Sequence, residues 1–535
     1  MERRYRQHRW YLFVALVALL MLAFAGCSDS DDDADASGTT AADGQTSTTV
    51  VEQGDVVKVP ADYPTIQEAV DAASEGSLIL ISPGTYEEAV DVTTDNLVIR
   101  GTDRNEVILD GGFELENGVR VLGANGVVVE NLTAQNYTGN GVFWTGVDGY
   151  RGSYLTTIKN GDYGVYAFGS VNGIIEQIYA SGSPDAGVYV GQCFPCNAHV
   201  RNVLSEWNGL GYSGTNSGGN LYITDSVWRN NRAGIVPNSG SYEGCAPETE
   251  TTVVGNLVYD NNNDKTGAIA NAMLGQGNGI LIAGGIGNVI ERNRVWGHEV
   301  AGIALAPFPE DDPISPLSER PEDNCQADAV PADEADMTDV DNPLFWPAKD
   351  NTVRGNVVSD SGATDLGLFA DPGEGNCFAD NEYTSSNPEN IDEAAPCGGT
   401  ENFEADYATL ASLLLVDRPE PPSYKDVELP DPGPQTNMPD AEKAPAEPAD
   451  NIVIDVDIEA IALPDRPDDA ASVSSTSAAD ASDGAESSSS TDPESDGAAD
   501  RTVGAGASST TRGNAAAGAG SSTTEAQSTT TASAE

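Results

Sequence analysis

Short apolar runs recur along the central part of the chain, each opened by a glycine and followed by polar turn residues. Within a run, apolar and polar positions alternate, as in GVYAF and NGIIEQIYA, and this alternation predicts β-strands rather than helices. Successive glycines are separated by 23, 23, 23, 24, 23, 45 and 23 residues. These repeat glycines are Gly118, Gly141, Gly164, Gly187, Gly211, Gly234, Gly279 and Gly302.

A repeat of strands and tight turns with this period predicts an all-β fold, a parallel β-helix in which each coil stacks on the next. We expect roughly 10–11 coils over residues 56–386. The interval of 45 residues indicates one coil-sized insertion or inserted loop between Gly234 and Gly279. Asparagines recur in turns just after a strand, where their amides are expected to stack as a structural ladder. They are Asn131, Asn202, Asn256, Asn293 and Asn356.

A helical pattern precedes the first coil. Residues 65–73 carry apolar side chains on one face, so we expect an amphipathic helix that covers the open strand edge of the solenoid. Strands around residues 78–81 and 89–92 follow it. The apolar face of the helix consists of Ile66, Ala69, Val70 and Ala73.

The segment IQEAVDAASEGSLILISPGTYEEAV resembles the N-terminal coil of the right-handed parallel β-helix superfamily. That superfamily includes pectin methylesterases, pectate lyases and the carbohydrate-binding and sugar-hydrolase domains, and the resemblance covers roughly residues 56–385. It implies the fold, but the fold alone does not give the function. Polygalacturonases carry motifs of the NTD, DD, GHG and RIK kind, and no ordered set of these occurs in this sequence; the nearby pieces are GHE at 297–299 and Asp311-Asp312. The DPHD motif of alginate epimerases is also absent. No catalytic residue is therefore transferred from the resemblance.

The first 27 residues have the pattern of an export signal, with arginines ahead of an apolar run that stops at small residues before Cys27. The ending FAGC resembles a bacterial lipobox, which implies a diacylglycerol on Cys27; an uncleaved anchor is the alternative. Either way we expect an extracytoplasmic protein held at the cell surface by its membrane anchor, and a monomer. Residues 28–55 are acidic and without periodicity, so a solvated stalk is expected.

The C-terminal part changes character twice. Residues 387–465 are predicted to be a proline-rich acidic linker with a short helix near 407–417 capping the last coil. Within the linker, NIVIDVDIEAIAL is interpreted as a strand that folds back on the solenoid. Residues 466–535 consist almost wholly of Ser, Thr, Ala, Asp and Gly, and we expect them to be disordered.

A long insertion, residues 307–349, leaves the coils and is interpreted as a wall over a groove. The formal net charge of -60 excludes nucleic acid as a bulk partner. General solubility, with adaptation to salt, is one explanation of the acidity, and Ca²⁺ binding is the other. Asp336, Asp339 and Asp341 of the insertion lack the glycine and terminal glutamate of an EF-hand. We therefore expect no resident cofactor, with Ca²⁺ left as the alternative.

The stretch GVYVGQCFPCNAHV places Cys193 and Cys196 three residues apart, with His199 three further on. Asn197 follows the second cysteine, so the motif is not the C-x-x-C-H of covalent haem attachment. A thioredoxin-like site needs a helix N-terminus, and zinc needs a fourth ligand. Disulfides are expected, as a local clip or as two bridges toward Cys245; a metal site and free thiols are the alternatives. The candidates are Cys193, Cys196, Cys245, Cys325, Cys377 and Cys397.

Two positions after each repeat glycine, side chains are expected to point outward and to stack in a column from coil to coil. In three consecutive coils this column holds Phe143, Tyr166 and Tyr189, whose rings suit stacking on sugars. The alternative is a stripe covered by a loop of the same chain. The expected ligand-binding residues are Phe143, Tyr166, Tyr189, Gln192, Asn216 and Asn238, and the candidate catalytic residues are Tyr166, Tyr189, Asp162, Asp185, His298 and Glu299.

Three functions are compatible with these patterns. The first is a surface protein that binds a polysaccharide, such as a uronate-containing or cell-wall glycan, along a groove of the solenoid. The second is a polysaccharide lyase, glycoside hydrolase or C5-epimerase, which needs an acid and a base beside the sugar. The third is a structural or adhesive protein with no small ligand. Missing catalytic motifs favour the first.

Overall fold

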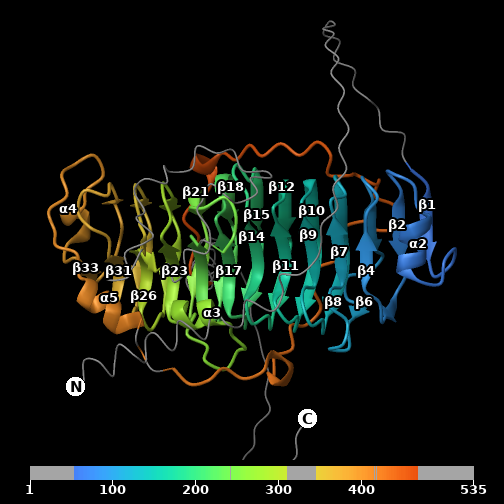
Figure 1. The fold of residues 1–535 in the computed structure, drawn as a ribbon, viewed down its shortest axis with the longest axis horizontal. Coiled ribbons are helices and arrows are strands. Elements are labelled where there is room, and N and C mark those ends of the chain that lie inside the picture. The colour runs from blue at the N-terminus through green and yellow to red at the C-terminus, as the bar shows by residue number, and fades with distance from the viewer. Residues whose placement is uncertain (1–53, 241, 310–344, 415, 417, 468–535) are drawn as a thin grey trace, which may run out of the picture. The chain divides into compact units, whose positions relative to one another are not determined.

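The computed structural model describes residues 54–240, 242–309, 345–414, 416 and 418–467, which all belong to one compact unit. This unit is a right-handed parallel β-solenoid of about 13 turns (Figure 1). The predicted fold class is therefore confirmed. The solenoid has more turns than the 10–11 coils expected over residues 56–386. The predicted export signal, Cys27, the stalk, most of the insertion with Cys325, and the tail after residue 467 lie outside the described residues.

Three ladders of parallel strands make up the solenoid. Two ladders belong to one sheet, called sheet A, and share the long strands β8 (Val127–Gln135) and β10 (Asp148–Ile158). The first ladder of sheet A also contains β1 (Val56–Val59), β2 (Leu78–Ile81), β5 (Val98–Gly101), β12 (Val171–Glu176), β15 (Ala198–Arg201), β18 (Gly218–Thr224), β21 (Thr249–Val254), β24 (Val289–Glu291), β29 (Thr352–Arg354) and β32 (Cys377–Ala379). The second also contains β3 (Gly84–Tyr86), β6 (Val107–Asp110), β13 (Tyr179–Ser181), β16 (Leu204–Glu206), β19 (Val227–Arg229), β22 (Leu257–Tyr259), β25 (Arg294–Trp296) and β30 (Val357–Ser359).

The third ladder forms sheet B, which carries the repeat glycines. Its strands are β4 (Val90–Val92), β7 (Val119–Leu122), β9 (Val142–Thr145), β11 (Tyr163–Phe168), β14 (Ala186–Gly191), β17 (Leu210–Thr215), β20 (Ala233–Asn238), β23 (Asn278–Ala283), β26 (Ala301–Ala306), β31 (Thr364–Leu368) and β33 (Ser386–Asn387). A small antiparallel pair, β27 (Phe308–Pro309) with β28 (Phe345–Trp346), stands where the insertion leaves and re-enters the coils.

Close packing of the coils explains the repeat glycines. A Cβ added to Gly164 would lie 2.5 Å from the carbonyl oxygen of Gly187, and one added to Gly234 would lie 2.3 Å from that of Gly279. The residue after each glycine points into the core: Val142 and Val165 are 0% exposed. The following residue must then point outward, because side chains alternate along a strand.

Asparagine ladders run between coils, but not with all the predicted members. The backbone N–H of Asn256 and that of Asn293 each donate to the side-chain oxygen of the next asparagine, at 3.0 and 2.9 Å. Asn356 continues this ladder. Asn131 and Asn202 were predicted members and are not part of it: both have positive φ, 57° and 52°, and so occupy the left-handed turn position next to it. Asn202 is also exposed.

The two ends of the solenoid are covered differently. At the N-terminal end, α2 (Ile66–Ala72) begins at the cap residue Thr65 and buries Ile66, Ala69 and Val70, as predicted. At the other end lies α4 (Ile391–Ala394), and Ile391 is part of the main core (Figure 1). The helix α5 (Tyr407–Leu414) was expected to cap the last coil. It instead packs beside sheet B, where Leu410 joins a buried cluster with Ala304.

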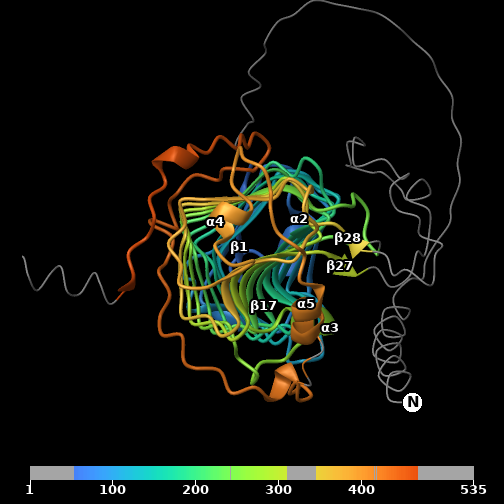
Figure 2. The same cartoon turned by 90° about the vertical axis from the view of Figure 1, so that its left-hand side faces the viewer.

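Residues 423–467, here called the strap, lie along the solenoid instead of extending from it (Figures 1 and 2). The strap includes the short helices η2 (Tyr424–Asp426) and η3 (Ile458–Ala460). No strand is described within residues 451–463, where one was predicted. The backbone of sheet A is already paired between coils, and arginine side chains bind the strap carbonyls instead.

The cysteines that the structure describes form disulfides, as predicted. Cys193 and Cys196 form a local bridge, and Cys377 pairs with Cys397. Cys245 is also disulfide-bonded. His199 is buried, and its ring nitrogen Nε2 lies 2.9 Å from the hydroxyl of Thr224. The CFPC motif is therefore part of the scaffold. Across the described ranges, no helix has the length and apolarity needed to cross a membrane.

Candidate active site on sheet B

The predicted aromatic column exists. The register of sheet B pairs Arg120 with Phe143, Phe143 with Tyr166, and Tyr166 with Tyr189. Tyr163 and Phe168 flank Tyr166 on the same strand, β11. We call Phe143, Tyr163, Tyr166, Phe168 and Tyr189 together the aromatic face.

The rings of the aromatic face pack against one another. Tyr163 stacks on Tyr166 with ring centroids 4.4 Å apart, and Tyr166 stacks on Phe168 at 5.7 Å. Tyr166 also lies 4.8 Å from Phe143 and 4.7 Å from Tyr189. Such contacts hold the rings in fixed orientations, which lowers the entropy lost when a ligand stacks on them.

Part of the column is covered by segments of the same chain, as one of the two alternatives expected; the stacking of sugars on the rest stays a prediction. The helix α3 (Ala270–Gly275) covers Val236 through Ala272, and α5 covers the coils beyond (Figure 2). Tyr189 is 1% exposed beneath the loop of residues 239–248. Phe143 and Tyr166 are half-buried, unlike Tyr189. An accessible aromatic surface therefore ends at a wall built by that loop.

Two carboxyl groups lie at this wall. The hydroxyl of Tyr189 donates to Oε2 of Glu243 at 2.5 Å. Burial raises the pKa of Glu243 to about 8, against a lowering by the Tyr189 bond. Burial likewise raises the pKa of Asp185 to about 7, while a hydrogen bond from Tyr163 lowers it. Each carboxyl group also raises the pKa of neighbouring tyrosines, Tyr163 and Tyr166 among them. The aromatic face thus holds two acids that titrate near neutral pH.

The predicted ligand-binding amides hold the 239–248 loop in place. Gln192 accepts a hydrogen bond from the N–H of Gly244 at 2.8 Å, and Asn238 donates to the hydroxyl of Tyr242 at 2.9 Å. Asn216 donates to the carbonyl of Glu243 at 2.9 Å and is fully buried. The three amides therefore position Glu243, and Asn216 is too deeply buried to touch a ligand.

The remaining predicted catalytic residues do not converge. Asp162 lies one coil before Asp185 and is exposed, at the edge of the aromatic face. His298 is 2% exposed, and neither ring nitrogen has a hydrogen-bond partner among the described residues. Burial lowers the pKa of His298 to about 3, so its imidazole is neutral and inaccessible. Glu299 is exposed, whereas His298, the residue before it, is buried.

Charge around the aromatic face is mainly negative. Arg120, next to Phe143 in the register, is engaged by Asp91 through two contacts, Nε to Oδ1 at 2.9 Å and Nη2 to Oδ2 at 3.0 Å. Within the ranges that the structure describes, no group of three or more His, Cys, Asp or Glu side chains is arranged as a metal-ligand set.

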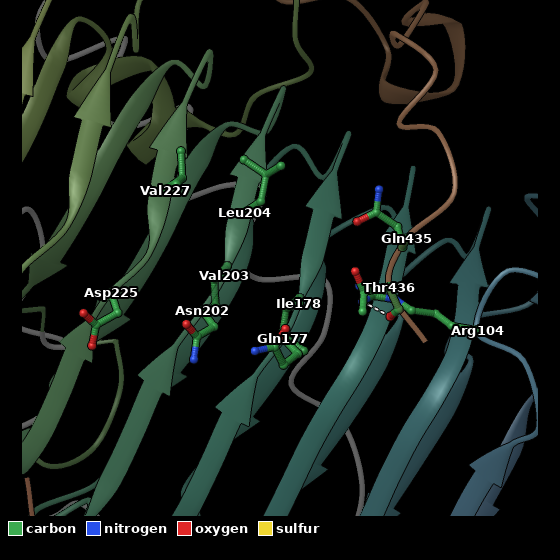
Figure 3. Close-up of a pocket in the computed structure, with 10 residues that line it drawn as sticks. All are labelled: Arg104, Gln177, Ile178, Asn202, Val203, Leu204, Asp225, Val227, Gln435 and Thr436. Atoms are coloured by element: carbon green, nitrogen blue, oxygen red, sulfur yellow. Dashed lines mark hydrogen bonds between the residues drawn. The ribbon is translucent and has the colours of Figure 1, made fainter. Parts of the chain in front are cut away.

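A cavity of about 260 Å³ lies elsewhere, between sheet A and the strap (Figure 3). Its lining includes Arg104, Asn202 and Asp225 on the solenoid side, and Gln435 with Thr436 on the strap. The side chain of Arg104 donates to the carbonyl of Thr436 at 3.2 Å. This lining has no aromatic ring, and Asp225 is its only carboxyl group.

Sequence reasoning missed Glu243 and Phe168, whereas Tyr163 was noted beside the column. Tyr163 and Phe168 are three residues before and two after Tyr166, on the same strand, so the alternation alone could have assigned Phe168 to the outer face. Glu243 gave no periodic signal, because it belongs to an irregular loop that meets sheet B only after folding.

Residues 117–307 match the family model described as "Right handed beta helix region". Similar solved structures include the A-module of the mannuronan C-5 epimerase AlgE4 of Azotobacter vinelandii, with 14% identity, a TM-score of 0.43, and coverage of 60% of this chain and 91% of that one. The alginate lyase of Paenibacillus sp. str. FPU-7 has 12% identity, a TM-score of 0.35, and coverages of 58% and 97%. The periplasmic alginate epimerase AlgG has 13% identity, a TM-score of 0.32, and coverages of 62% and 83%.

No curated protein matches the sequence significantly. The matched segment runs from just before the first repeat glycine to just after the last, so the family model covers the same coils that the 23-residue period marks. Residues 117–307 are thus a right-handed β-helix region, and the parallel solenoid continues beyond it at both ends.

Proposed function

We propose that this protein is an enzyme that acts on a polysaccharide bound along the aromatic face, with Glu243 as general acid and Asp185 as general base. The single observation that carries the proposal is the pair of carboxyl groups held among tyrosines, one of them bound by the Tyr189 hydroxyl at 2.5 Å. An acid and a base whose pKa values lie near the working pH are what proton transfer at a sugar requires.

Burial raises the pKa of both carboxyl groups toward the working pH, so one group of the pair can hold a proton while the other is ionised. Near pH 7.5, Asp185, with a pKa of about 7, is mostly ionised and can take up a proton. Glu243, with a pKa of about 8, is mostly protonated and can donate one. The half-buried rings of Phe143 and Tyr166 would hold the sugar by stacking against its C–H face. The proposal rests on this geometry and not on the alginate-acting proteins named above.

The test is an activity assay of the full chain on a panel of neutral, amino-sugar and uronate polymers, with reducing ends and unsaturated products as readouts. Glu243→Gln and Asp185→Asn are expected to lower kcat/KM by roughly 100-fold or more. Glu299→Gln is the matched control and should leave it unchanged, because Glu299 is exposed away from the face. The wild-type rate should peak between pH 7 and pH 8, since the base must be ionised and the acid protonated.

A panel without any product, or equal rates for Glu243→Gln and Glu299→Gln, would contradict the enzyme. Binding without turnover is the second candidate function, and the aromatic face itself favours it, because ring stacking needs no catalytic group. In that case Phe143→Ala and Tyr166→Ala would abolish polymer binding while Glu243→Gln would leave it intact.

A further inference from the structure

Resting on the proposed function, we infer that the aromatic face takes a glycan without carboxylate groups, a neutral or amino-sugar polymer, and that the reaction there is hydrolysis. The argument comes from the charges that border the face. A polyuronate presents a carboxylate on every sugar and needs a cation, or several strong donors, beside each one that it places in a site.

Two arginines near the face are already engaged. Arg120 is the arginine in line with the aromatic column, and its guanidinium is bound bidentately by Asp91. Arg232 is 0% exposed and donates to the side chain of Gln276 and to the carbonyl of Thr266. Within the described residues, the guanidinium groups of both arginines are therefore paired with other groups of the protein rather than free to bind a ligand carboxylate on the aromatic face.

The groups that do line the face are acids and rings. Glu243 and Asp185 stand at the wall, and exposed Asp162 stands at the edge. A uronate carboxylate placed here would face these carboxyl groups without a counter-charge, and the chain as a whole carries a formal charge of -60. A sugar bearing only hydroxyl or ammonium groups meets no such repulsion, and its hydroxyls can accept from a protonated carboxyl group.

This substrate class determines the chemistry. Elimination and C5-epimerisation both draw on the carboxylate of a uronate to stabilise the carbanion at C5, and a sugar without it gives no such stabilisation. Hydrolysis remains: Glu243 gives its proton to the glycosidic oxygen as the bond from that oxygen to the anomeric carbon breaks. Water supplies the hydroxyl to the anomeric carbon, and its proton passes to Asp185. One water is consumed per bond, and no other reactant is needed.

The test compares one polymer with and without its charges: polygalacturonate and the same sample after chemical reduction of its carboxyl groups. Binding to the full chain is measured with EDTA and, separately, with added Ca²⁺. We expect the reduced polymer to bind at least about 10-fold more tightly in both conditions, and Phe143→Ala to abolish this binding. Chitosan and its N-acetylated form distinguish amino sugars from neutral ones.

A second variant tests whether the ion pair with Asp91 keeps Arg120 from binding a carboxylate of the polymer. Asp91→Asn frees Arg120 and should raise the affinity for unreduced polygalacturonate several-fold while leaving that for the reduced polymer unchanged. Asp225→Asn, an exposed change on sheet A, is the matched control. Tighter binding of the unreduced polymer by the wild type, or binding of neither form, overturns the inference. Tight binding of the reduced polymer without hydrolysis supports its substrate class and contradicts the enzyme.

Discussion

Glu248 shows how far the behaviour of a single residue depends on its surroundings in the fold. It is 0% exposed and accepts hydrogen bonds from Thr251 at 2.7 Å and from Asn288 at 2.9 Å. Burial raises its pKa from 4.5 to about 8 despite these bonds. Glu299, by contrast, is exposed. Two glutamates in similar polar turns therefore differ because one is enclosed by neighbouring coils.

The raised pKa of Glu248 predicts a stability change with pH. The folded protein holds this proton more tightly than the unfolded chain, so the associated stability is present below about pH 4.5 and is lost as the pH rises to about 8. Replacing Glu248→Gln should make the free energy of unfolding less dependent on pH across that range, by about 1 kcal/mol per pH unit. Denaturant unfolding at several pH values measures this. An unchanged slope, equal to that of Glu299→Gln, would contradict it.

At the scale of elements, the turns between strands are held by asparagine amides. Asn293 accepts from the N–H of Asn256 at 3.0 Å, and its own N–H donates to Asn356 at 2.9 Å. Its amide also donates to the carbonyl of Val253 at 2.9 Å. The Asn293 side chain thus satisfies backbone groups in the coil before it, and its own N–H is satisfied by Asn356 in the coil after it. The ladder links coils at the turns as the strands link them along the sheets.

Truncating one rung should therefore be costly. Asn293→Ala removes the side-chain partner of two backbone groups, the N–H of Asn256 and the carbonyl of Val253, and we expect it to lower the free energy of unfolding by roughly 1–3 kcal/mol. Asn202→Gly is the control: it removes an exposed amide and keeps the positive φ of that turn, so a change below about 0.5 kcal/mol is expected. Equal losses in the two variants would show that the ladder does not stabilise the turns.

At the scale of the whole described unit, the strap ties distant coils together. Arg100, in an early coil, donates to the carbonyls of Ala444 at 2.6 Å and Pro445 at 2.9 Å. Arg294, in a late coil, donates to that of Pro464 at 2.7 Å. Arg100 is 1% exposed, so these carbonyls complete the shell of a buried charge that Glu130 binds at 2.6 Å. The strap therefore connects an early coil of the solenoid to a late one.

Removal of the strap should weaken both ends of the solenoid. A chain that stops after residue 422 leaves Arg100 and Arg294 without these partners, and we expect its thermal midpoint to fall by several degrees. A chain that stops after residue 467 keeps the strap and is the control, with an unchanged midpoint. Hydrogen exchange should increase in β5 and β25 only in the shorter chain. Identical midpoints for the two chains would mean that the strap is not stabilising.

Sequence alone determined what recurs from coil to coil. Glycine, an inward apolar residue and an outward residue repeat every 23 positions, so the class, the stacking of Phe143, Tyr166 and Tyr189, and the capping helix α2 could be predicted. These features depend on local alternation and on contacts between equivalent positions, which the period brings into register.

Only the tertiary structure determined the features that do not repeat from coil to coil. Asn202 and Asn293 occur in similar stretches, yet only the pairing of coils shows that they occupy neighbouring turn positions. Glu243 reaches Tyr189, and the strap reaches Arg100, through irregular segments 54 and more than 300 residues away in the chain. Their positions depend on packing between distant segments, and burial there sets the charge of each group. The scaffold and the aromatic column of the candidate active site could therefore be predicted from the repeat, whereas the position of Glu243 could not.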